Sequence, residues 1–140
     1  MTPKVVAKFL DNGWVSIGAR VVLCLPFWLG GLVKLIDFNG GSAEMAGFGL
    51  APGGVFNAIS IIIQLGGAVL VMFVPPLAWL GAAVLALYTL VMIPIAHAFW
   101  TLTGGASGGL LLAAGDRLAI VGGLALAAIL ARRPNLNRYY

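Results

Sequence analysis

Five ionisable residues lie in or beside strongly apolar segments of this chain, where hydrocarbon surroundings make charge expensive: Lys34, Asp37, His97, Asp116 and Arg117. A lysine or arginine can donate to an oxygen that gains negative charge during a reaction. A histidine can pass a proton near neutral pH, and a carboxylate can orient a cation or extend a proton relay. These residue types therefore indicate either binding of a polar group or proton transfer.

Chain reversal between helices would bring the five residues to a common depth, with Gln64 as the floor of the cluster. Two interpretations remain open. In the first, the charges form structural ion pairs, Lys34 with Asp37 or Asp116, and Asp37 with Arg117. In the second, the six residues bind a ligand or relay protons. No residue is assigned a catalytic role.

Metal, haem and thiol chemistry have little support in the sequence. His97 is the single histidine, and no second histidine or cysteine lies at ligand spacing from it, so we expect no metal site. Cys24 is the single cysteine, which excludes an intrachain disulfide. The glycine pairs lack the context of a phosphate-binding loop. We therefore expect no intrinsic cofactor.

The composition indicates an integral membrane protein. Of the 140 residues, 61% are hydrophobic and 9% are charged, whereas a soluble domain has about a quarter of its residues charged. Each span needs about 20 apolar residues. The chain therefore has room for four spans in one domain, residues 1–140, and we expect an all-α, up-down four-helix bundle. The predicted spans cover residues 15–36, 53–74, 77–100 and 110–131.

The positive charge is concentrated in the two tails, which contain five of the eight basic residues: Lys4, Lys8, Arg132, Arg133 and Arg138. Basic tails favour the cytoplasmic side, and four spans place both termini on one side. We therefore expect cytoplasmic termini and an outer, periplasmic location for the polar cluster. The same pattern argues against nucleic acid as a partner, since it is a membrane-topology signal.

Packing signals occur in three of the spans. Pro26 is predicted to kink the first span, because proline has no N–H to donate. Small and polar residues in the second span recur at spacings of three and four and should face other helices: Asn57, Ser60, Gln64, Gly67 and Val71. Small residues in the fourth span recur every four residues, a pattern of tightly packed membrane helices: Gly115, Ala119, Gly123 and Ala127.

The glycine-rich connection from Asp37 to Pro52 contains Glu44 as a second acid. Residues 42–48 are predicted to form a short interfacial helix, with Ser42 as its N-cap. Met45 and Phe48 are then expected to face the membrane.

Several short motifs together resemble the DoxX-like family of small four-helix membrane proteins. They are Arg20, the run Phe27-Trp-Leu-Gly-Gly-Leu-Val-Lys34 with Asp37-Phe38, the segment Gln64-Leu-Gly-Gly-Ala-Val-Leu70, and Ala96-His-Ala-Phe-Trp100. The likeness spans roughly Arg20 to Leu130. The family pattern commonly has a glutamate where this chain has Gln64, so no role that needs a carboxylate there is carried over. Arg117 lies where the family frequently has a basic residue.

The resemblance implies a multi-pass protein of the bacterial inner membrane, surrounded by the lipid bilayer and associated with other membrane-protein subunits. It also implies a link to quinone-dependent redox complexes. Our leading hypothesis is a subunit that binds a quinone at the outer polar cluster, with electrons supplied by a partner. The alternative is a non-catalytic accessory subunit of a respiratory or photosynthetic complex. A transporter is less well supported, because the inner half has no continuous polar path.

Overall fold

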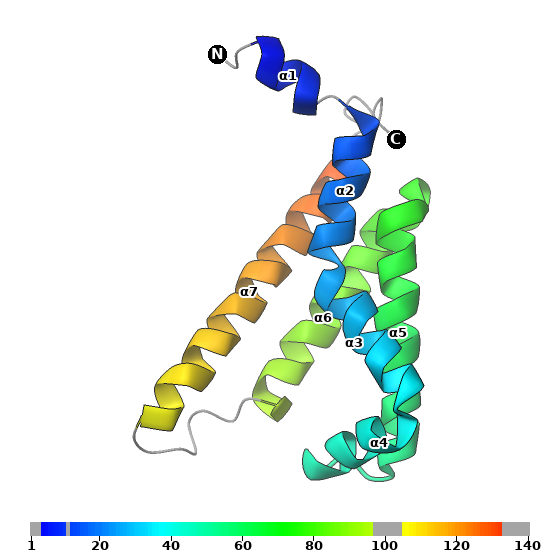
Figure 1. Ribbon diagram of the computed structural model, residues 1–140, viewed down its shortest axis with the longest axis vertical. Coiled ribbons are helices and arrows are strands. Elements are labelled where there is room, and N and C mark those ends of the chain that lie inside the picture. The colour runs from blue at the N-terminus through cyan, green and yellow to red at the C-terminus, as the bar shows by residue number, and fades with distance from the viewer. Residues whose placement is uncertain (1–3, 11, 97–104, 133–140) are drawn as a thin grey trace.

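A computed structural model describes residues 4–10, 12–96 and 105–132, and all regular structure within these ranges is helical (Figure 1). The elements follow in order: α1 (Lys4–Leu10), α2 (Gly13–Leu23), α3 (Leu25–Ile36), α4 (Phe38–Gly47), α5 (Gly53–Phe73), the 3₁₀ turn η1 (Pro75–Leu77), α6 (Ala78–Ala96) and α7 (Gly105–Ala131). The prediction of an all-α protein is confirmed for these residues.

Three stretches are long and apolar enough to cross a membrane: Gly53–Phe73, Pro75–Ala96 and Leu111–Ala131. A fourth crossing is formed if α2 and α3 are one span, bent by 54° at their junction. The chain therefore has three or four candidate spans. The predicted span 53–74 matches α5 to within a residue, and residues 97–100 of the predicted third span lie outside the described ranges.

The bend between α2 and α3 lies at Cys24, two residues before Pro26. Pro26 has no N–H for the carbonyl of Val22, so the helical hydrogen-bond ladder is interrupted there. The backbone N–H groups of the next two residues both donate to the Cys24 carbonyl, which starts α3 as a new helix. The indole Nε1 of Trp28 donates across the junction to the Val21 carbonyl at 3.2 Å. The predicted kink is confirmed.

The long segments alternate in direction (Figure 1). Helix α1 and the C-terminal end of α7 lie at one end of the molecule, while α4 lies across the other end. At the first end the Arg132 guanidinium stands over the Trp79 ring, 6.0 Å from its centre. The basic residues of α1 therefore share an end with Arg132.

Helices α5 and α6 pack closely because glycines remove side chains from their contact. A Cβ on Gly67 would lie 2.7 Å from Leu85 Cγ, and one on Gly81 would lie 2.7 Å from the Gly67 carbonyl oxygen. The predicted inward stripe of α5 is confirmed, since all five of its residues are buried: Asn57, Ser60, Gln64, Gly67 and Val71.

Helix α7 packs along α6 and reaches α2 with its C-terminal half, but its N-terminal half diverges from α3 (Figure 1). Among the side chains of α7 that the structure describes, the buried ones are Ala114, Leu124 and Ala131. The prediction that Gly115 and Ala119 pack tightly is wrong within this chain: Ala119 is exposed and a Cβ on Gly115 would meet nothing within 4 Å. Small residues every four positions make a flat face without specifying what covers it.

The connection after the first crossing forms a longer helix than predicted. Helix α4 starts at Phe38, and its N-cap is Asp37, not Ser42. The Ser42 hydroxyl instead donates to the Phe38 carbonyl at 2.7 Å. Met45 is 1% exposed and therefore belongs to the core, which corrects the prediction that it faces the membrane.

Candidate functional site

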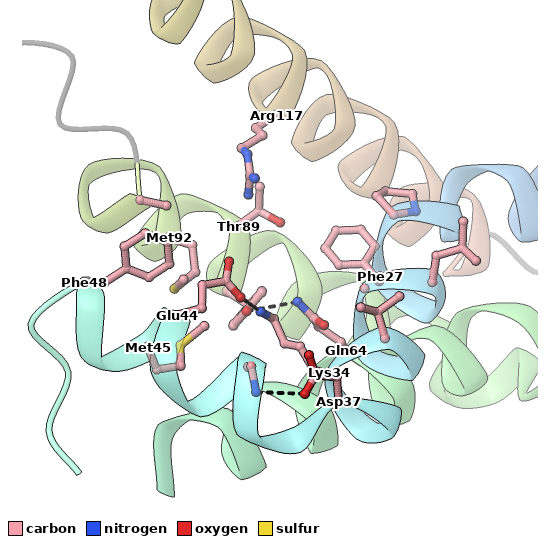
Figure 2. A pocket seen from close by; sticks show the side chains of 18 of the residues that line it. Phe27, Lys34, Asp37, Glu44, Met45, Phe48, Gln64, Thr89, Met92 and Arg117 are labelled. Carbon is pink, nitrogen blue, oxygen red and sulfur yellow. Dashed lines mark hydrogen bonds and ion pairs between the residues drawn. The ribbon is translucent and has the colours of Figure 1, made fainter. Parts of the chain in front are cut away.

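A cavity of about 570 Å³ opens where α7 diverges from α3, at the end of the molecule where α4 lies. Its volume falls within the range of about 300–1,000 Å³ that is usual for small-molecule sites. Helices α3, α4, α5, α6 and α7 all contribute to its wall (Figure 2). Much of the lining is apolar, including Phe27, Met45, Phe48, Met92 and Ile120. The polar lining includes Lys34, Asp37, Glu44, Gln64, Tyr88, Thr89 and Arg117.

Lys34 forms an ion pair with Glu44, which joins α3 to α4 at the rim of the cavity (Figure 2). The Lys34 side chain is 13% exposed and the Glu44 side chain 48%. The lysine is therefore largely shielded from solvent, whereas the glutamate is not. The predicted pairing of Lys34 with Asp37 or Asp116 is therefore wrong. Glu44 takes their place because α4 folds back beside α3, which brings a residue ten positions along the chain to the lysine.

Asp37 has a structural task. Its carboxylate accepts a hydrogen bond from the Gly40 backbone N–H at 2.9 Å and thereby caps α4. A Cβ on Gly40 would lie 2.2 Å from the Asp37 carboxylate, so the glycine leaves room for the cap. The predicted pairing of Asp37 with Arg117 is absent from the described contacts. Asp37 positions α4, and with it Glu44, at the cavity.

Gln64 lies on the wall of the cavity, 7% exposed, near the middle of α5. Its side-chain Nε2 donates to the Tyr88 hydroxyl at 3.0 Å, which ties α5 to α6. Its carbonyl oxygen Oε1 is buried and has no hydrogen-bond partner among the described residues. A buried acceptor without a hydrogen-bond donor destabilises the folded protein by about 1–3 kcal/mol. A donor placed next to Oε1 would therefore be stabilising.

The fourth span contributes one of its two predicted residues. Arg117 is half-buried, lines the cavity and extends from α7 towards Thr89 (Figure 2). It has no hydrogen bond or ion pair within the described ranges. Asp116 is exposed on another face of α7 and does not line the cavity. His97 lies outside the described residues.

The cavity is thus lined by four of the six candidate residues: Lys34, Asp37, Gln64 and Arg117. Three further residues of the cavity wall were missed: Glu44, Tyr88 and Thr89. Glu44 is one of only four acidic residues in the chain, and this scarcity was a signal that it needs a basic partner. Tyr88 lies within an apolar run of the sequence and was therefore not predicted as a site residue. The signal that could have found it is that a buried tyrosine hydroxyl usually has a hydrogen-bond partner.

The arrangement combines an apolar chamber with a cation on one wall and an amide–tyrosine pair on another. Arg117 can donate to a carbonyl or anionic oxygen, and the charge assistance makes such a bond about twice as strong as a neutral one. The apolar part of the wall favours a ligand with an apolar body. Such a chamber suits a lipophilic molecule that has a polar group at one end.

Fold and site together define a small polytopic α-helical membrane protein with a polar-lined cavity at one end of its spans. A family model for DoxX matches residues 16–98, which is more than half of the chain. The protein belongs to the DoxX family, and the resemblance noted in its sequence motifs is confirmed. Comparison with curated proteins and with solved structures gives no match.

Proposed function

We propose that this DoxX-family protein binds a quinone or a similar lipophilic carbonyl compound in the cavity. The observation that supports the proposal most directly is the cavity of about 570 Å³ with the Arg117 guanidinium on its wall, which has no partner in the described part of the chain. A half-buried cation beside apolar residues is stabilised by an oxygen acceptor, and a carbonyl of a hydrophobic ring supplies one without adding charge.

In this proposal the residues have different tasks. Arg117 donates to a ring oxygen and stabilises negative charge as it develops there. The Lys34–Glu44 pair keeps α4 against α3 and so maintains the mouth of the cavity. Phe27 and Met92 provide apolar contact for the ring. His97 remains a candidate for proton transfer, and the electrons come from a partner protein in a redox assembly.

The proposal includes an orientation in the membrane. Lys4, Lys8 and Arg132 gather at the end opposite α4, and basic residues favour the cytoplasmic side. With cytoplasmic termini in a bacterial inner membrane, the cavity opens in the outer half of the bilayer. A lipophilic ligand would then enter from the membrane, through the space between α7 and α3.

Equilibrium binding of decylubiquinone to the purified protein in lipid nanodiscs tests the proposal. Wild type should bind saturably, and Arg117→Met should bind about tenfold to a hundredfold more weakly, since a hydrogen bond from a charged group contributes about 1.5–3 kcal/mol. Lys8→Met is the matched control, because it removes a cation from α1, away from the cavity, and should leave affinity unchanged. Absence of saturable binding by wild type, or equal affinity of Arg117→Met, would contradict the proposal.

A second candidate function, that of a structural accessory subunit, is favoured by the outer face of α7. Only 11% of its apolar stretch is buried, against 39% for α5. Gly115 offers open space on this face, where a helix of another subunit could approach closely. Gly115→Leu should then release the protein from a larger native assembly on blue-native gels, while Gly66→Leu, at an equally open site on α5, should not. Unchanged migration of Gly115→Leu would argue against this function.

A further inference from the structure

In the Gln64 side-chain amide, the nitrogen has a hydrogen-bond partner and the oxygen has none among the described residues. Its Nε2 donates to the Tyr88 hydroxyl at 3.0 Å, whereas its Oε1 is buried without a donor among the described residues. The residue is 7% exposed and lies on the cavity wall. Because a buried carbonyl oxygen without a partner is costly, this position favours a ligand atom that brings a hydrogen to it.

Space beside Oε1 is preserved by Gly30, which also lines the cavity. A Cβ at Gly30 would lie 3.4 Å from Gln64 Oε1, in van der Waals contact with it. A larger residue at position 30 would therefore place its side chain against Oε1. Oε1 itself is buried without a donor among the described residues, and the Gln64 side chain that carries it lines the cavity.

Tyr88 adds a complementary group. Its hydroxyl oxygen accepts from Gln64, and its own hydrogen has no acceptor within the described contacts. A hydroxyl can both donate and accept. The pair thus offers an acceptor, Gln64 Oε1, next to a donor, the Tyr88 O–H. A ligand hydroxyl satisfies both, whereas a ligand carbonyl can only accept from Tyr88 and leaves Oε1 unsatisfied.

We propose that the Gln64–Tyr88 pair makes the cavity selective for a ring hydroxyl, so that it binds the hydroquinone form of its ligand more tightly than the quinone form. This inference rests on the proposed function, because it concerns the same cavity and ligand class. Arg117 contacts an oxygen in either form and does not discriminate between them. Selectivity comes from Gln64, since the quinone leaves its carbonyl oxygen without a donor.

Three ligands with one ring and one tail test the inference under anaerobic conditions: decylubiquinone, decylubiquinol and the dimethyl ether of that quinol. Their dissociation constants are measured with the wild-type protein in nanodiscs. The quinol should bind at least about tenfold more tightly than the quinone, because the donor to a buried acceptor is lost in the quinone. The ether has no hydrogen to donate and should lose the advantage of the quinol.

Two variants locate the effect. Gln64→Met keeps the length and apolar bulk of the side chain but removes the acceptor, so the ratio of quinone to quinol dissociation constants should fall close to one. Ser42→Ala is the matched control, because it removes a hydroxyl that donates a 2.7 Å hydrogen bond to the Phe38 carbonyl and does not line the cavity. Its ratio should equal that of wild type.

The outcomes separate the two proposals. Equal affinity of wild type for all three ligands would overturn the selectivity and leave the cavity as a ligand site, with a water molecule as the partner of Oε1. Binding of none of the three would overturn the proposed function and the selectivity with it. A quinol preference that persists in Gln64→Met would also overturn the assignment to Gln64. If that variant fails to fold, the comparison of ligands on wild type still decides.

Discussion

Replacing Gly81 with alanine tests the close contact between α5 and α6 that forms one side of the core. The new Cβ would lie 2.7 Å from the Gly67 carbonyl oxygen and 2.7 Å from Leu70 Cβ. Both atoms belong to, or are rigidly attached to, the backbone of α5, so the helices must move apart. Overpacking of this kind costs about 1–3 kcal/mol.

Gly66→Ala is the matched control, because a Cβ there meets nothing within 4 Å. Both variants gain the helix propensity of alanine, about 1 kcal/mol in water, and the gain cancels in the comparison. The free energy of unfolding of Gly81→Ala should therefore be about 1–3 kcal/mol below that of Gly66→Ala. The assay is equilibrium unfolding in mixed micelles of mild detergent and dodecyl sulfate, followed by circular dichroism. Equal unfolding free energies for the two variants would refute the packing argument.

Three further predictions concern the elements that position the site. Asp37→Ala should remove the cap of α4 and cost about 0.5–2 kcal/mol of unfolding free energy in the same assay, whereas Asp37→Asn should keep the cap and cost only a few tenths; equal losses would contradict the capping role. Glu44→Gln should leave Lys34 without its carboxylate and speed hydrogen exchange in α4, while Glu44→Asp should be closer to wild type; unchanged exchange would show that the pair does not hold α4. Trp28→Phe should lose the hydrogen bond to Val21 across the bend and about 0.5–1.5 kcal/mol of stability, and an unaltered stability would show that the bond contributes nothing.

The parts of the fold that could be predicted are those that depend on local spacing. The burial of Asn57, Gln64 and Val71 follows from a repeat of three and four residues, which places them on one helical face. The bend near Cys24 follows from the chemistry of Pro26 alone. Such features need no knowledge of which helix lies next to which.

The parts that could not be predicted depend on the path of the chain between helices. Lys34 pairs with Glu44 because α4 folds back beside α3, and no periodicity in the sequence specifies that reversal. The prediction that Gly115 and Ala119 of α7 pack tightly was wrong for a related reason. Gly115 and Ala119 form a face suited to close packing, but the helix presents Ala114 and Leu124 to the core.

The candidate site shows the same division between local and spatial information. Lys34 and Arg117 stand out in the sequence as ionisable residues in apolar segments, and both line the cavity. The hydrogen-bond partner of Gln64 could not be predicted from the sequence, since Tyr88 lies 24 residues away on the next helix. The unsatisfied Oε1 is a property of three-dimensional contacts and has no signature in the sequence.

Photoaffinity labelling is the most direct test that this cavity binds a lipophilic ring. The protein in nanodiscs is irradiated with an azidoquinone, with and without excess decylubiquinone, and the labelled peptides are mapped by mass spectrometry. The label should attach to cavity residues such as Phe27 or Met92, and the competitor should suppress it. Labelling confined to lipid-facing residues such as Leu112 and Leu126, with no effect of the competitor, would contradict the assignment of the cavity as the binding site.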